Sequence, residues 1–277
     1  MRYHFPDAMC SMLTQTNYTS CPKCGHTPLP ADQSLPAACP ACGLILAKFA
    51  AVIPRVPADA DNSEVEDNSA QSWLSQWRRD VLAAATHIPP RVDPAAFWVR
   101  VAMLVLFAAW GLALIRLDFR TAEINASFLH GPLLVFHEAG HVLFRLLGEF
   151  MTILGGTLGQ LLMPAILCGA LLIKNRDPYG AAIGLWLLGV SVLDVAPYIY
   201  DALHPQMVLL GGHTGEEGGH DWIYLLGETG HIKRAQSLGW LIHKAGALVV
   251  LLAIGWAAWI LKQQHARIGA ERDSPEM

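Results

Sequence analysis

The chain has 277 residues, of which 53% are hydrophobic and 15% are charged, and its formal net charge is -4. Soluble domains carry about 25% charged residues, so this composition favours a membrane protein. The weak negative charge and the lack of a basic tract argue against a nucleic-acid partner.

The first 50 residues contain two matching C-x-x-C-G sequences. Their cysteines are Cys21, Cys24, Cys39 and Cys42. Four thiolates fill the tetrahedral sphere of a structural zinc ion and leave no open position for catalysis. The spacing is typical of a zinc ribbon, with a pair of redox dithiols as the alternative. We therefore expect residues 1–50 to form a zinc ribbon. It should lie in the cytoplasm, because thiols stay reduced there, and it could bind a cytoplasmic partner.

Residues 51–90 are predicted to form an acidic linker followed by a helix beside the membrane. Residues 54–72 are rich in Asp and Glu and contain two prolines, a composition that buries too little apolar surface to fold. Trp73, Trp77 and Val81 then recur at helical spacing next to Arg78 and Arg79. This pattern favours an amphipathic helix on the membrane surface, with docking on the ribbon as the alternative.

Residues 91–264 are predicted to form the transmembrane domain, and residues 265–277 a polar tail. The apolar runs long enough to span a bilayer are 95–117, 126–147, 151–173, 180–200 and 235–261. The glycine-rich stretch 155–160 could instead be re-entrant. The expected fold is thus an all-α polytopic membrane protein with about five transmembrane helices and a small N-terminal zinc ribbon.

Arginines before the first run, among them Arg78, Arg79 and Arg91, favour a cytoplasmic N-terminus. The first residues, 1–7, contain no apolar stretch, so we expect no cleavable signal peptide. An odd number of spans would leave Lys262 and Arg267 outside, against the usual positive-inside distribution.

The second apolar run contains the sequence His137-Glu138-Ala139-Gly140-His141. In a helix the two histidines lie about one turn apart on the same face, where both can bind one zinc ion. Glu138 lies beside them and can accept a proton from water. The pattern predicts a catalytic zinc site inside an apolar environment.

Such a site needs a third protein ligand. Asp194 and Asp201 are seven residues apart in the fourth run, with Pro197 between them, and Pro197 should kink or open the helix. The glycine-rich loop at 205–231 offers His220 and Asp221 as further ligands; alternatively, Asp221 only caps a short helix.

The H-E-x-x-H sequence in one span and the Pro-then-Asp segment two spans later resemble the site-2 protease family of intramembrane zinc metalloproteases. The resemblance covers roughly residues 117–202. It implies that Asp201 is the third zinc ligand, ahead of Asp194, Asp221 and His220. This chain departs from the family pattern at Ala202, where the family has glycine, and at Asp194, where it has asparagine.

The resemblance implies a zinc metallopeptidase that cleaves membrane-protein substrates within the lipid bilayer. The expected cofactors are one catalytic zinc ion, with Glu138 as the base, and one structural zinc ion. The expected location is a bacterial inner membrane. The alternatives are a non-catalytic scaffold or sensor that keeps the metal site, or a metal-ion transporter with carboxylates along its path.

Overall fold

The computed structural model describes residues 18–34, 37–46 and 62–273. The chain divides into two compact units, Met1–Ser72 and Trp73–Met277. Residues 47–61, which hold the first part of the expected acidic linker, lie outside the described residues. So do Cys10 and the last four residues of the tail.

The described part of the first unit consists mainly of turns around the four cysteines, with one isolated antiparallel bridge between Ala38 and Ile45. From Asn62 the chain is helical, and helix α2 extends over Asn62–Ala85. A linker was expected as far as residue 72, but the last proline before this helix is Pro57, and α2 contains neither proline nor glycine. Nothing in the α2 sequence therefore interrupts a helix.

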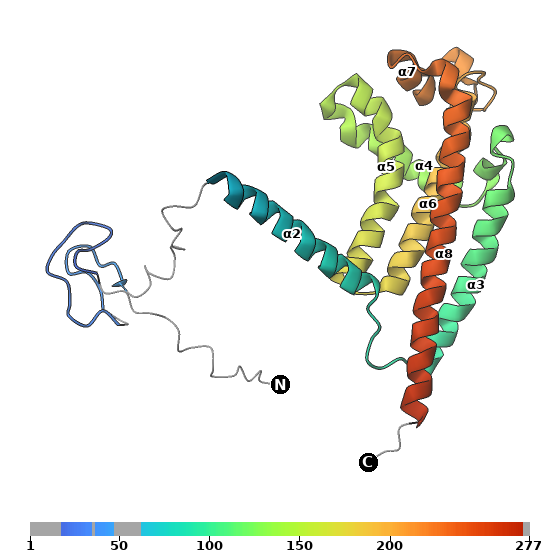
Figure 1. Ribbon diagram of the computed structural model, residues 1–277. Coiled ribbons are helices and arrows are strands. Elements are labelled where there is room, and N and C mark those ends of the chain that lie inside the picture. Colours follow the sequence, from blue (N-terminus) through green and yellow to red (C-terminus); the bar gives the residue numbers. More distant parts are fainter. Residues whose placement is uncertain (1–17, 35–36, 47–61, 274–277) are drawn as a thin grey trace. The chain divides into compact units, whose positions relative to one another are not determined.

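The second unit is helical in all its long elements (Figure 1). Its α-helices are α3 (Pro94–Arg116), α4 (His130–Phe144), α5 (Glu149–Gly169), α6 (Pro178–Asp201), α7 (Asp221–Glu228) and α8 (Ala235–Asp273). Short 3-10 turns lie at Phe119–Thr121, Glu123–Ala126, Arg145–Leu147, Gly215–Glu217 and Ile232–Arg234, and a π turn at Ala170–Lys174 extends α5. An isolated bridge joins Val208 and Thr214 in the loop after α6.

Two of the long helices begin with the same local signal. The Asp93 carboxylate accepts hydrogen bonds from the first free amides of α3, and Pro94 occupies its first position. Asp177 and Pro178 repeat the arrangement at the start of α6. The aspartate satisfies amides that have no partner within the helix, and the proline has no amide to satisfy.

Four described helices are long and apolar enough to cross a membrane: Pro94–Arg116, Glu149–Lys174, Pro178–Asp201 and Ile232–Ala270. They indicate an integral membrane protein. The expectation of about five spans needs correction at the second run, 126–147. There, α4 has 15 residues and is about 22 Å long, against a hydrocarbon core of about 30 Å. Turns at Glu123–Ala126 and Arg145–Leu147 shorten this helix at both ends.

Two other expectations about helix continuity also need correction. Helix α5 runs unbroken through residues 155–160, so this stretch is not re-entrant. Helix α6 is likewise continuous, with Pro197 inside it, and does not open between Asp194 and Asp201.

Helix α6 lies at the centre of the bundle, with α8 and α3 on one side and α4 and α5 on the other (Figure 1). Trp186, Val190 and Leu193 of α6 are almost fully buried against Val250 of α8 and Leu114 of α3. Small residues allow the closest approach, because a side chain on Gly189 or Gly246 would collide with the facing helix. This packing explains why α6 is buried to a much greater extent than α3, most of whose apolar side chains face outward.

Helices α4 and α5 also meet through glycines. A Cβ atom on Gly140 would collide with the carbonyl oxygen of Gly155, and one on Gly159 would lie 2.5 Å from the carbonyl oxygen of Phe136. The two backbones therefore touch directly over the segment that contains H-E-x-x-H. Helix α4 is held against a membrane-spanning neighbour although it is too short to span by itself.

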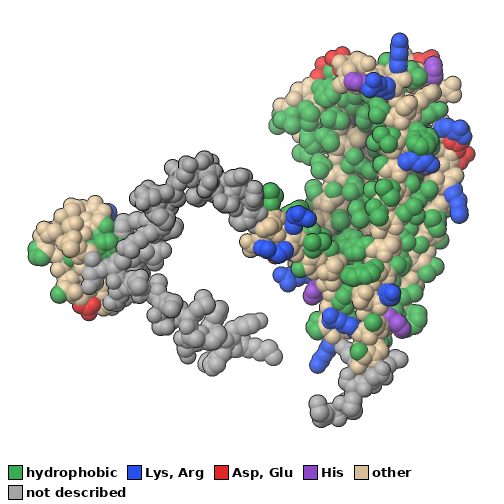
Figure 2. All heavy atoms as spheres, in the orientation of Figure 1, with side chains coloured by type: hydrophobic (Ala, Val, Ile, Leu, Met, Phe, Trp, Pro, Cys, Tyr) green, Lys and Arg blue, Asp and Glu red, His purple; other side chains and the backbone are tan. Residues whose placement is uncertain are grey.

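Hydrophobic side chains cover the flank of the helical unit in Figure 2, and most of the charged side chains gather at its two ends. Large exposed apolar residues of the helical unit include Trp98 and Leu106 of α3 and Leu248 and Leu252 of α8. An apolar band between two polar ends is the surface that a bilayer requires.

An even number of spans places both flanks of the bundle on one side of the membrane. We expect epitope tags at the two ends of the chain to be digested together by protease in sealed vesicles of one orientation. A tag inserted at Gly212, in the loop after α6, should show the opposite accessibility. End tags with opposite accessibility would mean that a fifth segment, α4, also crosses.

Candidate metal centres

The described residues contain two groups of side chains that could hold a metal ion, and the first is the cysteine group. Its members are Cys21, Cys24, Cys39 and Cys42, whose sulfur atoms all lie within 4.8 Å of one another. The separation is 3.6 Å between Cys21 and Cys42 and 3.8 Å between Cys24 and Cys39. Zinc bonded to sulfur at about 2.3 Å in a tetrahedron would place sulfur atoms ~3.8 Å apart, so the group fits the ion.

Two matching turns aim these sulfur atoms. Gly25 and Gly43 adopt positive φ angles of 72° and 70°, and their amides donate to the carbonyl oxygens of Cys21 and Cys39. Only glycine adopts such angles at little cost, which explains its place after each C-x-x-C. Burial raises the pKa of the Cys21 thiol, but hydrogen bonds from the Lys23 and Cys24 amides and from neighbouring thiols outweigh it and lower the pKa to about 6. For Cys24, a hydrogen bond from the His26 amide lowers the pKa, but burial and the neighbouring thiols outweigh it and raise the pKa to about 12. The thiolate, which is the form that binds metal, is therefore favoured at Cys21 and disfavoured at Cys24.

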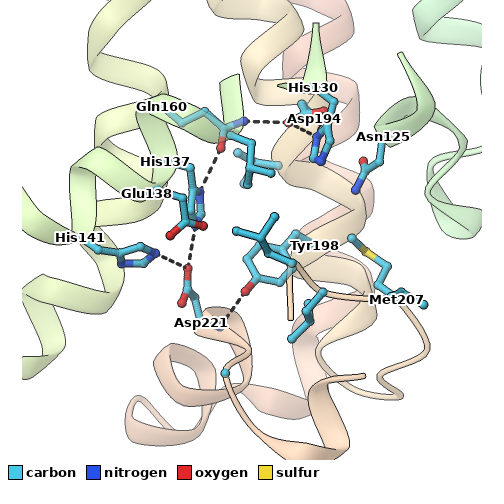
Figure 3. Close-up of a pocket in the computed structure, with 16 residues that line it drawn as sticks. Asn125, His130, His137, Glu138, His141, Gln160, Asp194, Tyr198, Met207 and Asp221 are labelled. Atoms are coloured by element: carbon cyan, nitrogen blue, oxygen red, sulfur yellow. Dashed lines mark hydrogen bonds and ion pairs between the residues drawn. The ribbon is translucent and has the colours of Figure 1, made fainter. Parts of the chain in front are cut away.

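The second group consists of His137 and His141 of α4 and Asp221 of α7 (Figure 3). The Asp221 Oδ2 atom lies 2.9 Å from Nε2 of His137 and 3.4 Å from Nε2 of His141. A tetrahedral ion bonded at about 2.0–2.1 Å would hold neighbouring donors roughly 3.3 Å apart. The observed separations bracket this value.

Each imidazole uses its other nitrogen for a hydrogen bond. Nδ1 of His137 lies 3.1 Å from the side-chain oxygen of Gln160, and Nδ1 of His141 lies 2.9 Å from the carbonyl oxygen of Thr152. Both oxygens can only accept, so each Nδ1 carries the proton and each Nε2 presents a lone pair. Two lone pairs and a carboxylate oxygen can thus converge on one point, which is the arrangement of acceptors that a shared cation would bind.

The space for that cation comes from Gly156 of α5. A Cβ atom built there would lie 2.5 Å from Nε2 of His137 and 2.6 Å from Nε2 of His141. Any side chain at this position would therefore fill the place that a shared ion needs. The missing side chain, the converging acceptors and their spacing together fit a three-ligand metal site with room for one more ligand.

Asp221 is brought to the histidines by the loop after α6. It is the first residue of α7, and its backbone amide donates to the Tyr198 hydroxyl oxygen at 3.0 Å. The residue that caps α7 is His220, whose Nδ1 accepts from the Ile223 amide at 3.3 Å. The expectation that Asp221 caps this helix is therefore wrong by one residue. Because His220 is the cap, the Asp221 carboxylate is free to face α4.

Asp201, the carboxylate preferred from sequence as third ligand, is not in this group. It is buried at the end of α6, where its Oδ1 accepts from the amides of Gln206 and Met207 at 2.8 and 3.1 Å. Its Oδ2 faces Nε2 of His220 at 3.4 Å, an electrostatic contact and not a well-formed hydrogen bond. Asp201 and His220 thus pin the start of the loop and the start of α7, and Asp221 takes the position expected for Asp201.

Asp194 also lies apart from the three donors. It is bonded to His130 of α4 and to Gln160 of α5. Gln160 and Gly156 were not predicted from the sequence as residues of the site, although Gln160 is a lone amide in an otherwise apolar run. A polar residue inside a span needs a partner, and this was the available signal.

The histidines and Asp221 open onto a cavity of about 200 Å³. Glu138 and Tyr198 line the same cavity, and so do Asn125, His130 and Asp194 at its other end (Figure 3). The cavity thus combines the candidate metal-binding group with Glu138, a carboxylate that is not part of the group. No protein-family model, no curated protein and no solved structure matches the chain, so its function has to be inferred from its own residues and their geometry.

Substitution of the two candidate aspartates should separate their roles. We expect the wild type to bind about two zinc ions per chain, one per group, and Asp221→Asn to bind about one, because a neutral amide is a poor zinc ligand. Asp201→Asn should still bind two, since its amide oxygen can accept from Gln206 and Met207. Elemental analysis of the purified protein measures this, and the reverse pattern would return the ligand role to Asp201.

A methyl group at the candidate ion position gives a second test. Gly156→Ala should lose the zinc ion of the α4 site and keep that of the cysteines. Gly169→Ala, in the same helix but with open space around it, should keep both. If Gly156→Ala binds both ions with wild-type affinity, the ion does not lie against Gly156.

Proposed function

We propose that the protein is an intramembrane zinc peptidase, with zinc held by His137, His141 and Asp221 and with Glu138 as the catalytic base. The observation that carries the proposal is the convergence of two imidazole nitrogens and one carboxylate beside an independent carboxylate in one cavity. The H-E-x-x-H sequence supplies three of these four residues, and the resemblance to site-2 proteases supports the same chemistry. A peptidase is favoured over a transporter because the intramembrane carboxylate Asp194 is already bonded to two side chains.

The residues of the cavity have distinct roles in this proposal. A bound zinc ion supplies Lewis acidity, which polarises the substrate carbonyl and acidifies water. Glu138 accepts the proton of the attacking water and delivers it to the leaving amine. Tyr198 accepts from the Asp221 amide, so its own hydroxyl proton remains available for the oxygen that becomes negatively charged.

The substrate in this proposal is the membrane-spanning segment of another protein. The cavity is bordered by α4, which is shorter than the bilayer, and the outer surface of the helical unit is apolar. A substrate helix would have to unwind locally to enter, because helical peptide bonds are shielded by their own hydrogen bonds. The polar end of the cavity offers partners to the backbone groups that unwinding exposes.

The proposed location is a bacterial inner membrane with both flanks of the bundle in the cytoplasm. With four spans, Arg78, Arg79 and Arg91 before α3 lie on the same side as Lys262 and Arg267 near the end of α8. The conflict that five spans would create with the positive-inside distribution then disappears. The cysteine group would be a zinc ribbon on this reducing side, where it recruits a cytoplasmic partner.

Replacement of the base tests the activity. Membranes from cells that produce wild type or Glu138→Gln should differ in new peptide termini within membrane-spanning segments, detected by terminal-peptide mass spectrometry. The variant should yield none of these termini and still bind about two zinc ions per chain, because Glu138 is not a ligand. Glu149→Gln, which removes an exposed carboxylate at the start of α5, is the matched control and should behave as wild type.

Cleavage that persists in Glu138→Gln would end the proposal. The absence of new termini with the wild type would also end the proposal. The scaffold alternative would then predict that substitution of the cysteines changes the phenotype of the cells and that Glu138→Gln does not.

A further inference from the structure

We propose that Gln160 and Asp194 are positioning residues that fix the ring of His137, so that its Nε2 atom faces the ion. The inference deepens the proposed function, because it rests on the same metal site. It concerns a chain of side chains that runs from the site into the bundle: His137, Gln160, Asp194 and His130 (Figure 3).

The chain is anchored by the Asp194 carboxylate. His130 Nδ1 lies 3.0 and 3.1 Å from its two oxygens, and the Gln160 amide nitrogen donates to Oδ2 at 2.9 Å. An ionised carboxylate can only accept hydrogen bonds. Both neighbours must therefore turn donors towards it.

The hydrogen bond to Asp194 fixes the orientation of the Gln160 amide. An amide has its donor nitrogen and its acceptor oxygen on opposite sides, so the nitrogen turned to Asp194 leaves the oxygen turned to His137. That oxygen lies 3.1 Å from Nδ1 of His137 and forces this atom to be the donor. The proton of the neutral ring is then on Nδ1, and Nε2 is left as the ligand.

Burial makes the arrangement rigid. Gln160 is 3% exposed and Asp194 is 6% exposed, so bulk water has little access to either side chain. Ser191 of α6 donates its hydroxyl to the Gln160 carbonyl oxygen at 3.0 Å, which ties the backbone of α5 at this residue to α6. Asp194 lies seven residues before Asp201, the last residue of α6. It is therefore about 10 Å deeper in the helical bundle than Asp201, measured along the helix axis. Buried polar groups at such depth are costly unless they are fully paired.

The two histidines are held differently, which makes the inference specific. His141 donates to the Thr152 carbonyl oxygen, a backbone group that no substitution removes. His137 depends on a side chain, and that side chain depends on a second one. Changes at residues 160 and 194 should therefore act on the metal site through His137 alone.

The test is the zinc affinity of the full-length protein in detergent, measured by competition with a chelator. The cysteine group of the same chain serves as the internal reference. Gln160→Met keeps the length of the side chain and removes both polar ends, and we expect it to weaken zinc binding at the α4 site about 10- to 100-fold. Affinity at the cysteine group should not change.

Two comparisons separate positioning from packing. Thr157→Val is the matched control, since the Thr157 hydroxyl is buried in α5 with no hydrogen-bond partner, and it should leave both affinities unchanged. Asp194→Leu should weaken zinc binding as Gln160→Met does, while Asp194→Asn should restore most of it, because the asparagine oxygen can still accept from Gln160.

Wild-type affinity in Gln160→Met would overturn the inference, and so would an equal loss in Thr157→Val. Failure of the underlying site would look different: His137→Ala would keep the second zinc ion. These measurements of zinc affinity do not depend on cleavage. If the affinities change as expected but Glu138→Gln still cleaves, the proposed activity is wrong and the inference about Gln160 and Asp194 stands.

Discussion

The arrangement around Gly156 is the constraint on which the second unit depends. Two imidazole nitrogens with free lone pairs and a carboxylate oxygen point at one place, and the neighbouring helix offers no side chain there. Acceptors at such distances repel one another unless a cation lies among them. The helical bundle holds these groups together in an apolar environment, in an arrangement that could bind a metal ion.

The bundle achieves this by pressing a short helix against a long one. Helix α4 cannot span a bilayer, and its backbone lies directly on α5 through Gly140, Gly155 and Gly159. Close contact between small residues is how helices associate where lipid provides no hydrophobic driving force. The same contact sets the distance between the H-E-x-x-H face and Gly156, so one group of glycines determines both the helix packing and the geometry of the candidate metal group.

Local patterns in the sequence were sufficient for several features that depend on neighbouring residues. The H-E-x-x-H face, the four cysteines and the predominantly helical character each follow from spacing within one segment, and the four long helices agree with four of the expected runs. The fifth run was mistaken for a span because hydropathy ignores the turns that shorten α4 at both ends. Apolar length alone does not say where a helix stops.

The third donor shows the other limit. Asp201 was preferred because the Pro-then-Asp segment resembles the site-2 protease pattern. The carboxylate that lies beside the histidines is instead Asp221, 20 residues later, at the start of α7. Its position depends on Tyr198, on the contact of His220 with Asp201, and on a helix of eight residues. None of these contacts produces a periodic pattern that can be recognised in the sequence. Gln160, by contrast, could have been noticed as a solitary amide in an apolar run.

The origin of this donor outside the spanning helices has a consequence for biosynthesis. When α6 has been synthesised, the nascent chain already contains both histidines but still lacks Asp221. The centre can close only when the following loop has been translated and has folded back. A chain that ends before Asp221 would therefore contain only two of the three candidate ligands, although it already contains three of the four helices long enough to cross a membrane.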